Sequence, residues 1–234
     1  MADFGDRVAV VTGASSGIGR RAAEMLADRG ARVAIFARSA EKLSAIASAH
    51  ASRMFAVTGD AAEPADVERL FEQTEARFGP CDILVNCAGM IDPGLVVDTD
   101  AERWDRMFAV NARSAFLACR RALPRMIERR SGVIVNVSSI SGVPGPEKFP
   151  GFASYNASKA AIIAFTEALA VEVKQHGVRV NCVSFGSVDT PMWAAASGGA
   201  PAEMTADEAA ESILFLASPQ SRPMNGQNLH VYSV

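Results

Sequence analysis

The chain has 234 residues, of which 49% are apolar and 21% charged, an ordinary composition for a globular protein with one large α/β domain. The net charge of −3 offers no basic surface of the kind that binds nucleic acid or anionic membranes, so neither is expected as a partner. No run of about 18 apolar residues occurs, so we expect no membrane-spanning segment.

The cysteines and the N-terminus predict the compartment. Cys81, Cys87, Cys119 and Cys182 are scattered, without the spacing of a metal site or of a small disulfide framework. The chain enters its first apolar run at residues 7–11 without a basic and then apolar leader. We therefore expect no metal and a cytoplasmic location.

Short β-branched runs alternate with longer amphipathic stretches along the whole chain. Near-continuous apolar strands separated by helices predict a parallel sheet with helices on both faces, and right-handed crossovers make it doubly wound. No repeat or long linker divides the chain, so we predict a single domain. The candidate strands are 7–12, 32–37, 53–58, 82–86, 132–138, 178–184 and 228–232, and the candidate helices are 17–29, 39–49, 64–78, 101–128, 154–175 and 206–217.

The first strand runs into a glycine-rich turn, Thr12-Gly13-Ala14-Ser15-Ser16-Gly17-Ile18-Gly19, which is followed by an alanine-rich helix. Glycines let the backbone turn tightly and approach a pyrophosphate, which the positive end of the helix attracts. The spacing is G-x-x-x-G-x-G rather than G-x-G-x-x-G, and the Gly-Lys-Ser/Thr of a P-loop is missing. Turns need glycine for other reasons, but a position between a first strand and a helix favours dinucleotide binding.

The second strand ends at Arg38, where many NAD-binding folds carry an acid that holds the ribose 2′-hydroxyl. A guanidinium at this point suits a 2′-phosphate instead. The alternative is a solvated arginine at the end of a strand. We therefore expect NADP(H) in preference to NAD(H).

Two loops follow predicted strands, where open α/β sheets bind ligands. Residues 142–153 contain too many prolines and glycines for a helix or a central strand, and residues 191–205 are rich in small residues. We expect both loops to shape a ligand pocket.

The predicted helix at 154–175 is apolar around nearly its whole circumference, so we expect it to be buried on all sides. In a domain of this size, one side would meet another subunit. We predict a homodimer or homotetramer that assembles through the helices around 101–128 and 154–175.

Tyr155 and Lys159 are four residues apart and project from one face if their segment is helical. A positive charge beside a phenol favours the phenolate form and makes the phenol useful as an acid or base. Taken alone, this common spacing favours the structural alternative, a half-buried aromatic at a helix start beside a lysine that reaches to solvent.

The glycine-rich turn at 12–19, the sequence Asn86-Cys87-Ala88-Gly89 after the fourth strand, and Tyr155 with Lys159 together resemble the short-chain dehydrogenase/reductase family. The resemblance covers nearly the whole chain, and the ordered combination of these motifs is specific. It implies a Rossmann-type sheet of about seven strands. Residues 1–90 would mainly bind the dinucleotide, and residues 100–234 would carry the catalytic residues and the substrate loops.

The resemblance also implies catalytic roles. Tyr155 is expected to be the general acid/base, with Lys159 as the partner that favours its phenolate and holds the nicotinamide ribose. Ser139 matches the serine that hydrogen-bonds the reacting carbonyl oxygen, although Ser138 is its neighbour. Asn111 matches the asparagine of a water-linked proton relay, and its alternative role is to stabilise a helix kink.

Cofactor contacts follow from the same resemblance. Asp60, followed by Ala61, matches an acid that meets the adenine amino group, and Val188 and Thr190 match residues at the nicotinamide carboxamide. Asn86 and its neighbours would flank the adenosine ribose and stabilise the central sheet. The full expected set of cofactor-binding residues is Gly13, Ser15, Ser16, Gly17, Ile18, Gly19, Arg38, Asp60, Ala61, Asn86, Ala88, Gly89, Tyr155, Lys159, Gly186, Val188 and Thr190.

The chain departs from the family pattern around the expected substrate site. Phe185 replaces a usual proline before Gly186, and the segment 140–154, which contains Glu147, is longer than usual. The loop 191–205 is shorter than usual, so we expect the common lid helices to be absent and the pocket to be open. The tail at 230–234 lacks a common Asp-Gly-Gly turn.

These observations predict an NADP(H)-preferring oxidoreductase that transfers a hydride between the cofactor and a small-molecule carbonyl or secondary alcohol. A 3-oxoacyl-thioester reductase and a sugar or polyol dehydrogenase remain alternatives within the same chemistry. A catalytically silent NADP(H)-binding regulator is the alternative from another functional class.

Overall fold

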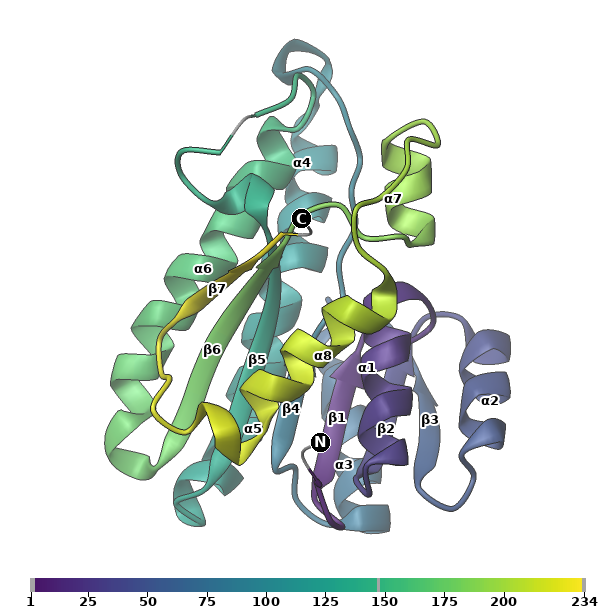
Figure 1. The fold of residues 1–234 in the computed structure, drawn as a ribbon, viewed down its shortest axis with the longest axis vertical. Helices are drawn as coiled ribbons and strands as arrows, with labels where there is room; N and C mark the ends of the chain where they lie inside the picture. Colours follow the sequence, from purple (N-terminus) through teal and green to yellow (C-terminus); the bar gives the residue numbers. More distant parts are fainter. Residues whose placement is uncertain (1–2, 147, 233–234) are drawn as a thin grey trace.

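A seven-stranded parallel sheet forms the centre of the protein in our computed structural model, which describes residues 3–146 and 148–232 (Figure 1). The strands lie in the order β3-β2-β1-β4-β5-β6-β7, and every neighbouring pair is parallel. The predicted doubly wound α/β fold is confirmed. The strands are β1 (Val8–Thr12), β2 (Arg32–Ala37), β3 (Met54–Thr58), β4 (Ile83–Asn86), β5 (Gly132–Ser139), β6 (Val178–Phe185) and β7 (Asn228–Val231).

The helices follow the predicted segments closely, with two exceptions described below. In the described part of the chain, no helix combines the length and the apolar character needed to cross a membrane. The α-helices are α1 (Gly17–Asp28), α2 (Ala40–Ala49), α3 (Pro64–Phe78), α4 (Ala101–Phe108), α5 (Ser114–Glu128), α6 (Ala153–Val173), α7 (Pro191–Ala196) and α8 (Ala206–Ala217).

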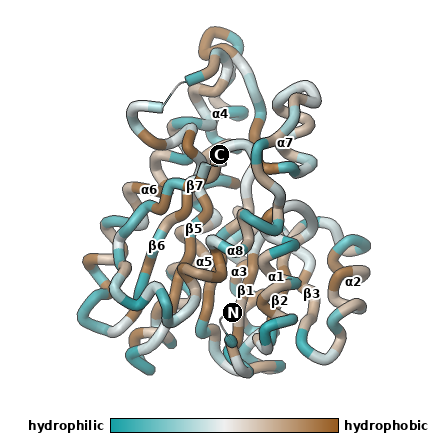
Figure 2. Tube along the Cα trace, in the orientation of Figure 1, coloured by the Kyte–Doolittle hydropathy of each residue, from teal (hydrophilic) through white to brown (hydrophobic). Residues whose placement is uncertain are grey.

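Apolar side chains cover both faces of the sheet. Ala9 and Val11 of β1 pack on one face with residues of α1, α2 and α8, whereas Val10 packs on the other face with residues of α3, α5 and α6. Burial on both faces explains why the strands are near-continuous apolar runs. Figure 2 shows hydrophobic colouring along the central strands and more hydrophilic colouring on outer turns.

The predicted helix at 101–128 is not continuous. A π-helical turn over Ala109–Arg113 separates α4 from α5. Such turns occur inside α-helices where one extra residue is accommodated, often at functional sites. Asn111 lies in this turn and is buried.

The loop at 191–205 also differs from expectation, because it begins with the short helix α7. The hydroxyl of Thr190 accepts a hydrogen bond of 3.2 Å from the Trp193 amide and caps this helix. One short helix therefore stands where none was expected. Glu147 of the longer loop, and Ser233 and Val234 of the tail, lie outside the described residues.

The strand order reverses between β1 and β4, and such a reversal leaves a crevice at the carboxyl ends of the strands. The hydroxyl of Thr12, at the end of β1, accepts hydrogen bonds of 3.2 Å from the amides of Cys87 and Ala88. The turns after these two strands are thus held side by side at the place where a ligand site is expected.

Candidate active site

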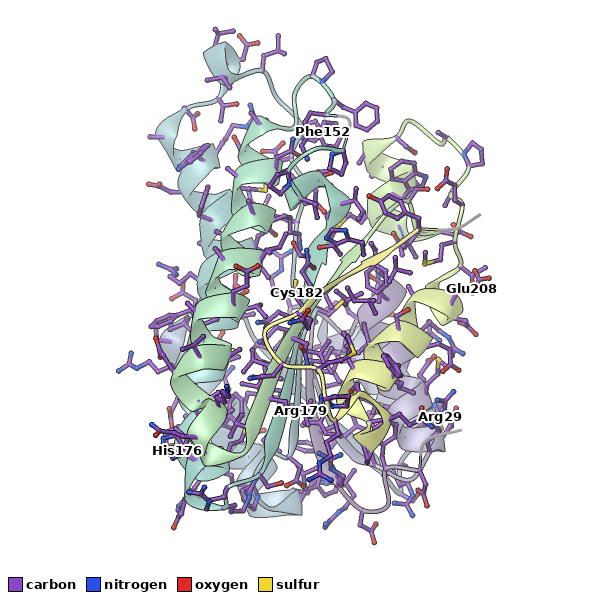
Figure 3. All side chains as sticks on the ribbon, turned by 60° about the vertical axis from the view of Figure 1, so that its left-hand side comes forward. Arg29, Phe152, His176, Arg179, Cys182 and Glu208 are labelled. Carbon is purple, nitrogen blue, oxygen red and sulfur yellow. The ribbon has the colours of Figure 1, made fainter. Side chains whose placement is uncertain are left out.

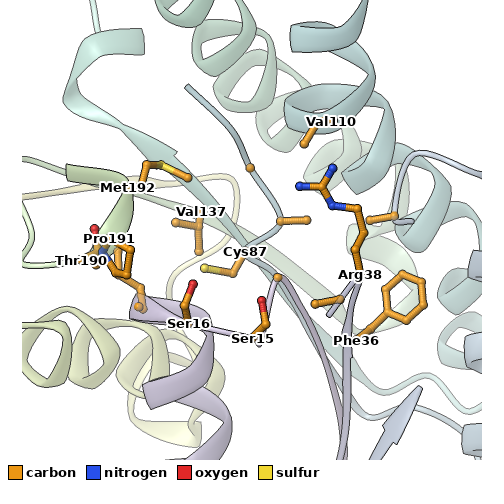
Figure 4. A pocket seen from close by; sticks show the side chains of 18 of the residues that line it. Ser15, Ser16, Phe36, Arg38, Cys87, Val110, Val137, Thr190, Pro191 and Met192 are labelled. Atoms are coloured by element: carbon orange, nitrogen blue, oxygen red, sulfur yellow. The ribbon is translucent and has the colours of Figure 1, made fainter. Parts of the chain in front are cut away.

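A cavity of about 340 Å³ opens at this reversal, and Figure 4 shows it from close by. Its wall is formed by the glycine-rich turn, the ends of β2 and β5, the segment after β4, and the first turns of α6 and α7. The predicted site residues that line it are Gly13, Ser15, Ser16, Gly17, Ile18, Gly19, Arg38, Asp60, Ala61, Ala88, Gly89, Tyr155, Lys159 and Thr190.

Three glycines of the turn are required by close backbone packing. A Cβ atom on Gly13 would lie 2.6 Å from the carbonyl oxygen of Cys87, and one on Gly19 would lie 2.6 Å from that of Gly13. Gly17 has a φ of +54°, and a Cβ atom there would lie 2.9 Å from Thr190 Cγ2. Larger residues at these positions would displace the turn or the wall opposite it.

The first turn of α1 presents a favourable surface to an anion. Its N-cap residue Ser16 makes no side-chain capping hydrogen bond, and the first helical turn contains no acidic residue. The amides of Gly17, Ile18 and Gly19 belong to this turn, and all three residues line the cavity. The Gly19 amide donates to the Cys87 sulfur, and the remaining amides together with the positive end of the helix suit a phosphate group.

Arg38 lies at one end of the cavity. In Figure 4 its guanidinium is on the opposite side from Thr190 and Met192, with Ser15 and Ser16 between them. Among the residues that the structure describes, none of the recorded ion pairs includes Arg38. The side chain is exposed, so its charge is available to a ligand.

Tyr155 and Lys159 lie at the other end, on the first turns of α6. The Lys159 ammonium is buried, with the residue only 5% exposed, and it donates a hydrogen bond of 3.1 Å to the carbonyl of Val137. Its Nζ atom lies 5.8 Å from the centroid of the Tyr155 ring. The i, i+4 arrangement therefore brings a fixed positive charge beside a partly exposed phenol.

The two serines at the end of β5 have different environments. Ser138 is buried, and its hydroxyl donates a hydrogen bond of 2.8 Å to the Lys159 carbonyl, which ties β5 to α6. Ser139 is partly exposed; its hydroxyl accepts a hydrogen bond from the Ser141 amide at 3.1 Å and has a long contact of 3.5 Å with the Phe185 carbonyl. Ser138 lines the cavity and Ser139 does not, but the hydroxyl of Ser139 is the less engaged of the two, and its contact with a substrate stays a prediction.

Gly142 sets the distance between the end of β5 and helix α6. A Cβ atom on Gly142 would lie 2.6 Å from the backbone nitrogen of Ala160 and 2.6 Å from the carbonyl carbon of Lys159. Both neighbours are backbone atoms of a helix, which cannot move aside independently. The absence of a side chain here therefore keeps the 140–142 turn directly against α6.

The side chain of Asn111 holds three segments together. Its Oδ1 atom accepts from the Met90 amide at 2.7 Å, and its Nδ2 atom donates to the Met90 carbonyl at 3.0 Å and to the Ser158 hydroxyl at 2.9 Å. The Ser158 hydroxyl in turn donates to the Tyr155 carbonyl at 2.8 Å. This buried position in an irregular helical turn agrees with the structural alternative for Asn111, and its part in a proton relay stays a prediction.

Comparison with known proteins identifies the family. The sequence model of the short chain dehydrogenase family matches residues 7–199. The chain belongs to the short-chain dehydrogenase family. It is therefore an oxidoreductase, and its family implies a nicotinamide nucleotide of the NAD(P) type as cofactor.

Similar proteins match the chain over almost its full length. The 2-(R)-hydroxypropyl-CoM dehydrogenase of Xanthobacter autotrophicus is 36% identical, covering 95% of this chain and 96% of its own. A 3-oxoacyl-(acyl-carrier-protein) reductase of Staphylococcus aureus is 34% identical, covering 95% of each chain. The crystal structure of levodione reductase is 26% identical and superposes with a TM-score of 0.91, over 97% of this chain and 96% of the other.

Some predicted residues of this short-chain dehydrogenase lie behind the cavity wall. The Asn86 side chain donates to Asn136 Oδ1 at 2.8 Å within the sheet, in line with the expected sheet-stabilising role. Val188 is buried and pairs with Met204 in an isolated parallel bridge, and the Gly186 amide donates to the Val231 carbonyl. Contacts of these residues with a cofactor remain predictions.

Other residues line the cavity without having been predicted. Gly59 and Val110 directly precede the predicted residues Asp60 and Asn111, so their place near the cavity follows from those predictions. For Phe36, only the fold brings the side chain to the cavity. Pro191 and Met192 belong to the loop 191–205, which was expected to shape the pocket. The other wall residues that were not predicted individually are Phe36, Ala37, Ser39, Gly59, Cys87, Val110, Val137 and Ser138.

Cys87 places a thiol in the cavity wall between the glycine-rich turn and Lys159. Burial raises the pKa of the Cys87 thiol to about 11, and the nearby Lys159 ammonium offsets this only in part. The thiol is therefore protonated at neutral pH and is not an activated nucleophile. Cys87 acts as a small apolar residue at this position.

The contact of Gly142 with α6 predicts the effect of a small substitution. We expect Gly142→Ala to lower the free energy of unfolding by about 1–3 kcal/mol, because the added methyl group must push backbone atoms apart. Urea denaturation followed by circular dichroism measures this loss.

Gly186→Ala is the matched control, since a Cβ atom there would lie 3.8 Å from its nearest neighbours, at an ordinary contact distance. Equal free energies of unfolding in the two variants would contradict the packing role of Gly142.

Proposed function

We propose that this short-chain dehydrogenase is an NADP(H)-preferring carbonyl reductase or alcohol dehydrogenase. The observation that carries the proposal is a single cavity with Arg38 at one end, Tyr155 and Lys159 at the other, and the glycine-rich turn between them. Along NADP(H), the 2′-phosphate of the adenosine, the pyrophosphate and the nicotinamide follow one another, and Arg38, the glycine-rich turn and the Tyr155–Lys159 pair lie in the same order along the cavity.

The residues of the cavity fit such a cofactor. The glycine-rich turn and the uncapped first turn of α1 would hold the pyrophosphate, and Arg38 would pair with the 2′-phosphate. Asp60 would meet the adenine, and Thr190 would meet the nicotinamide carboxamide. A guanidinium without an ion-pair partner among the described residues favours a ligand that brings its own negative charge.

Tyr155 and its neighbours would manage the proton and the charge on the substrate oxygen. The bound nicotinamide supplies or accepts the hydride. During reduction, Tyr155 donates a proton to the carbonyl oxygen as negative charge develops there, and during oxidation its phenolate removes the alcohol proton. The Lys159 ammonium stabilises the phenolate charge, and Ser139 donates a second hydrogen bond to the substrate oxygen.

Removing the acid and its charged neighbour tests this mechanism. We expect Tyr155→Phe to lower kcat by at least about 100-fold, the scale of a general-acid contribution, while NADPH still binds in a fluorescence titration. Lys159→Met should also lose activity. Lys174→Met, at the exposed end of the same helix, should retain it. Near-full turnover in Tyr155→Phe or in Lys159→Met would refute the assigned roles.

The cofactor preference rests on Arg38. We expect Arg38→Ala to lower kcat/KM with NADPH by at least about tenfold, the scale of one charge-assisted contact, with little change for NADH. Steady-state kinetics with both cofactors provides the measurement, and the exposed Arg222→Ala serves as the control. Comparable efficiency with both cofactors that persists in Arg38→Ala would overturn the preference.

A 3-oxoacyl-thioester reductase is the second candidate. The relative from Staphylococcus aureus that carries a name of this type matches the chain end to end. The same Tyr155 chemistry would serve a thioester substrate, so the distinction lies in the substrate pocket. A steady-state screen of ketones, acyl thioesters and polyols with both cofactors decides between the candidates.

We also propose that the chain forms a homodimer or homotetramer through the helices around 101–128 and 154–175. In the single chain, α6 is exposed along Ala160, Ala164, Ala168 and Val171, whose spacing of three or four places them on one face. Val171 is 77% exposed. Glu167 is also exposed on this face, which is otherwise built of small and apolar residues and so supports burial against a second copy.

Light scattering at micromolar concentration tests the assembly. We expect a mass of two or four times the chain mass of 24.7 kDa. Ala164→Arg, which places a charge on the exposed face of α6, should shift the protein toward the monomer, whereas Ala51→Arg, after α2, should not. A strictly monomeric mass for the unmodified protein would contradict the proposal.

A further inference from the structure

Three aromatic rings form a chain that leads outward from the candidate acid. The Phe152 ring meets the Tyr155 ring edge to face, with centroids 6.3 Å apart at an interplanar angle of 85°. The Phe149 ring meets the Phe152 ring in the same way, at 6.2 Å and 64°. Figure 3 shows Phe152 at the end of α6 opposite His176, beside the loops at the carboxyl edge of the sheet. The aromatic surface is therefore continuous from Tyr155 to the surface of the protein.

The outermost ring is held in place by its backbone. The Gly94 amide donates a hydrogen bond of 2.9 Å to the Gly151 carbonyl, which ties the segment after β4 to the aromatic segment. The Phe152 amide donates to the Phe149 carbonyl at 3.3 Å, which closes a turn before α6. Phe149 is nevertheless 58% exposed, so its ring face is free to contact another molecule.

Other apolar side chains are exposed at the same edge of the sheet. Leu95 is 52% exposed and follows Gly94, which is bonded to the aromatic segment. Met192 is 39% exposed and lines the cavity, and Tyr232 is 53% exposed beside Gly186. Met192 therefore adds an apolar group to the cavity that Tyr155 lines, and Leu95 and Tyr232 are further exposed apolar groups on neighbouring segments.

The cations near this approach are already engaged. In the segments 90–103 and 140–152, the sequence contains one arginine and one lysine. The Lys148 ammonium lies against three backbone carbonyls, with distances of 2.8 Å to Ser141 and 2.6 Å to Val143. The Arg103 guanidinium makes a two-pronged ion pair with Asp92 at 3.0 Å. The Arg103 charge is therefore neutralised by Asp92, whereas the exposed Lys148 ammonium is held by neutral carbonyl groups and keeps its charge.

We infer that the substrate of this enzyme carries an uncharged aromatic group near its carbonyl, and that this group packs against Phe149 and Phe152. The inference rests on the proposed function and specifies its substrate class. Rings pack edge to face on the aromatic chain, whereas a short aliphatic ketone reaches only Tyr155 and the cofactor end of the cavity.

A matched set of substrates tests the inference. Benzylacetone and methyl ethyl ketone are both methyl ketones, and benzylacetone differs by one added phenyl group. Acetoacetyl-coenzyme A, the third substrate, carries an anionic tail. We expect kcat/KM for benzylacetone to exceed that for methyl ethyl ketone by at least about tenfold, the scale of burying one aromatic side group. It should also exceed that for acetoacetyl-coenzyme A. NADPH and NADH are each used as cofactor.

Variants of Phe149 test whether this residue causes the preference for benzylacetone over methyl ethyl ketone. We expect Phe149→Ala to lower the ratio of kcat/KM for benzylacetone to that for methyl ethyl ketone by about fivefold, the scale of one aromatic pair. Phe149→Tyr keeps the ring and should keep the ratio. Phe215→Ala removes another exposed phenylalanine, on α8, and should leave the ratio unchanged.

The outcomes separate the inference from the proposed function. Equal efficiency with the two ketones, a preference for acetoacetyl-coenzyme A, or an unchanged ratio in Phe149→Ala overturns the inference while Tyr155-dependent carbonyl reduction stands. Failure to consume either cofactor with any of the three substrates overturns the proposed function and the inference with it.

Discussion

The site depends on the close approach of two backbones where the strand order reverses. Gly13 lies against the carbonyl of Cys87, with room for a hydrogen atom but not for a methyl group. Helix α1 begins at Gly17, shortly after Gly13, and Gly89, two residues after Cys87, lies close to the Lys159 ammonium. This single contact therefore sets the spacing between the glycine-rich turn that leads into α1 and the segment beside Lys159, and any side chain at Gly13 would move the two apart.

Buried polar groups connect the two halves of the site beneath the cavity. Asn86 of β4 donates to Asn136 of β5 at 2.8 Å, Asn136 donates to the Thr166 hydroxyl at 2.9 Å, and Thr166 donates to the Ile162 carbonyl in α6 at 2.8 Å. Asn136 and Thr166 are fully buried, so each bond in this chain is protected from competing water. The chain fixes α6, and with it Tyr155, relative to the strand that precedes the cofactor segment.

The helices and strands could be predicted from the sequence because burial leaves a recognisable pattern of apolar residues in each of them. The strands buried on both faces are uniform apolar runs, and α1 and α8 begin within a residue of their expected positions. Tyr155 and Lys159 were predicted as a pair because their relation is local. The helix at 101–128 was predicted as continuous, although a kink at Asn111 was the expected alternative role of that residue, and the π-helical turn there is held by the contact of Asn111 with Met90. The loop at 142–153 was expected to border the pocket, but the stacking of Phe149 and Phe152 toward Tyr155 follows from no local pattern.

The π-helical turn has a consequence for how the surface and the interior of the enzyme can change. Each residue of an α-helix advances about 100° around the axis, and the wider π-helical turn fits one extra residue into roughly the same rotation. The turn therefore absorbs the extra residue and leaves the side of α4 that carries the 41% exposed Trp104 facing outward, while α5 stays packed against the sheet. Deleting one residue here would convert the turn to regular helix and keep the facing of Trp104, but it would disturb the contact of Asn111 with Met90. The outer face of α4 and the interior contacts of Asn111 can therefore change separately.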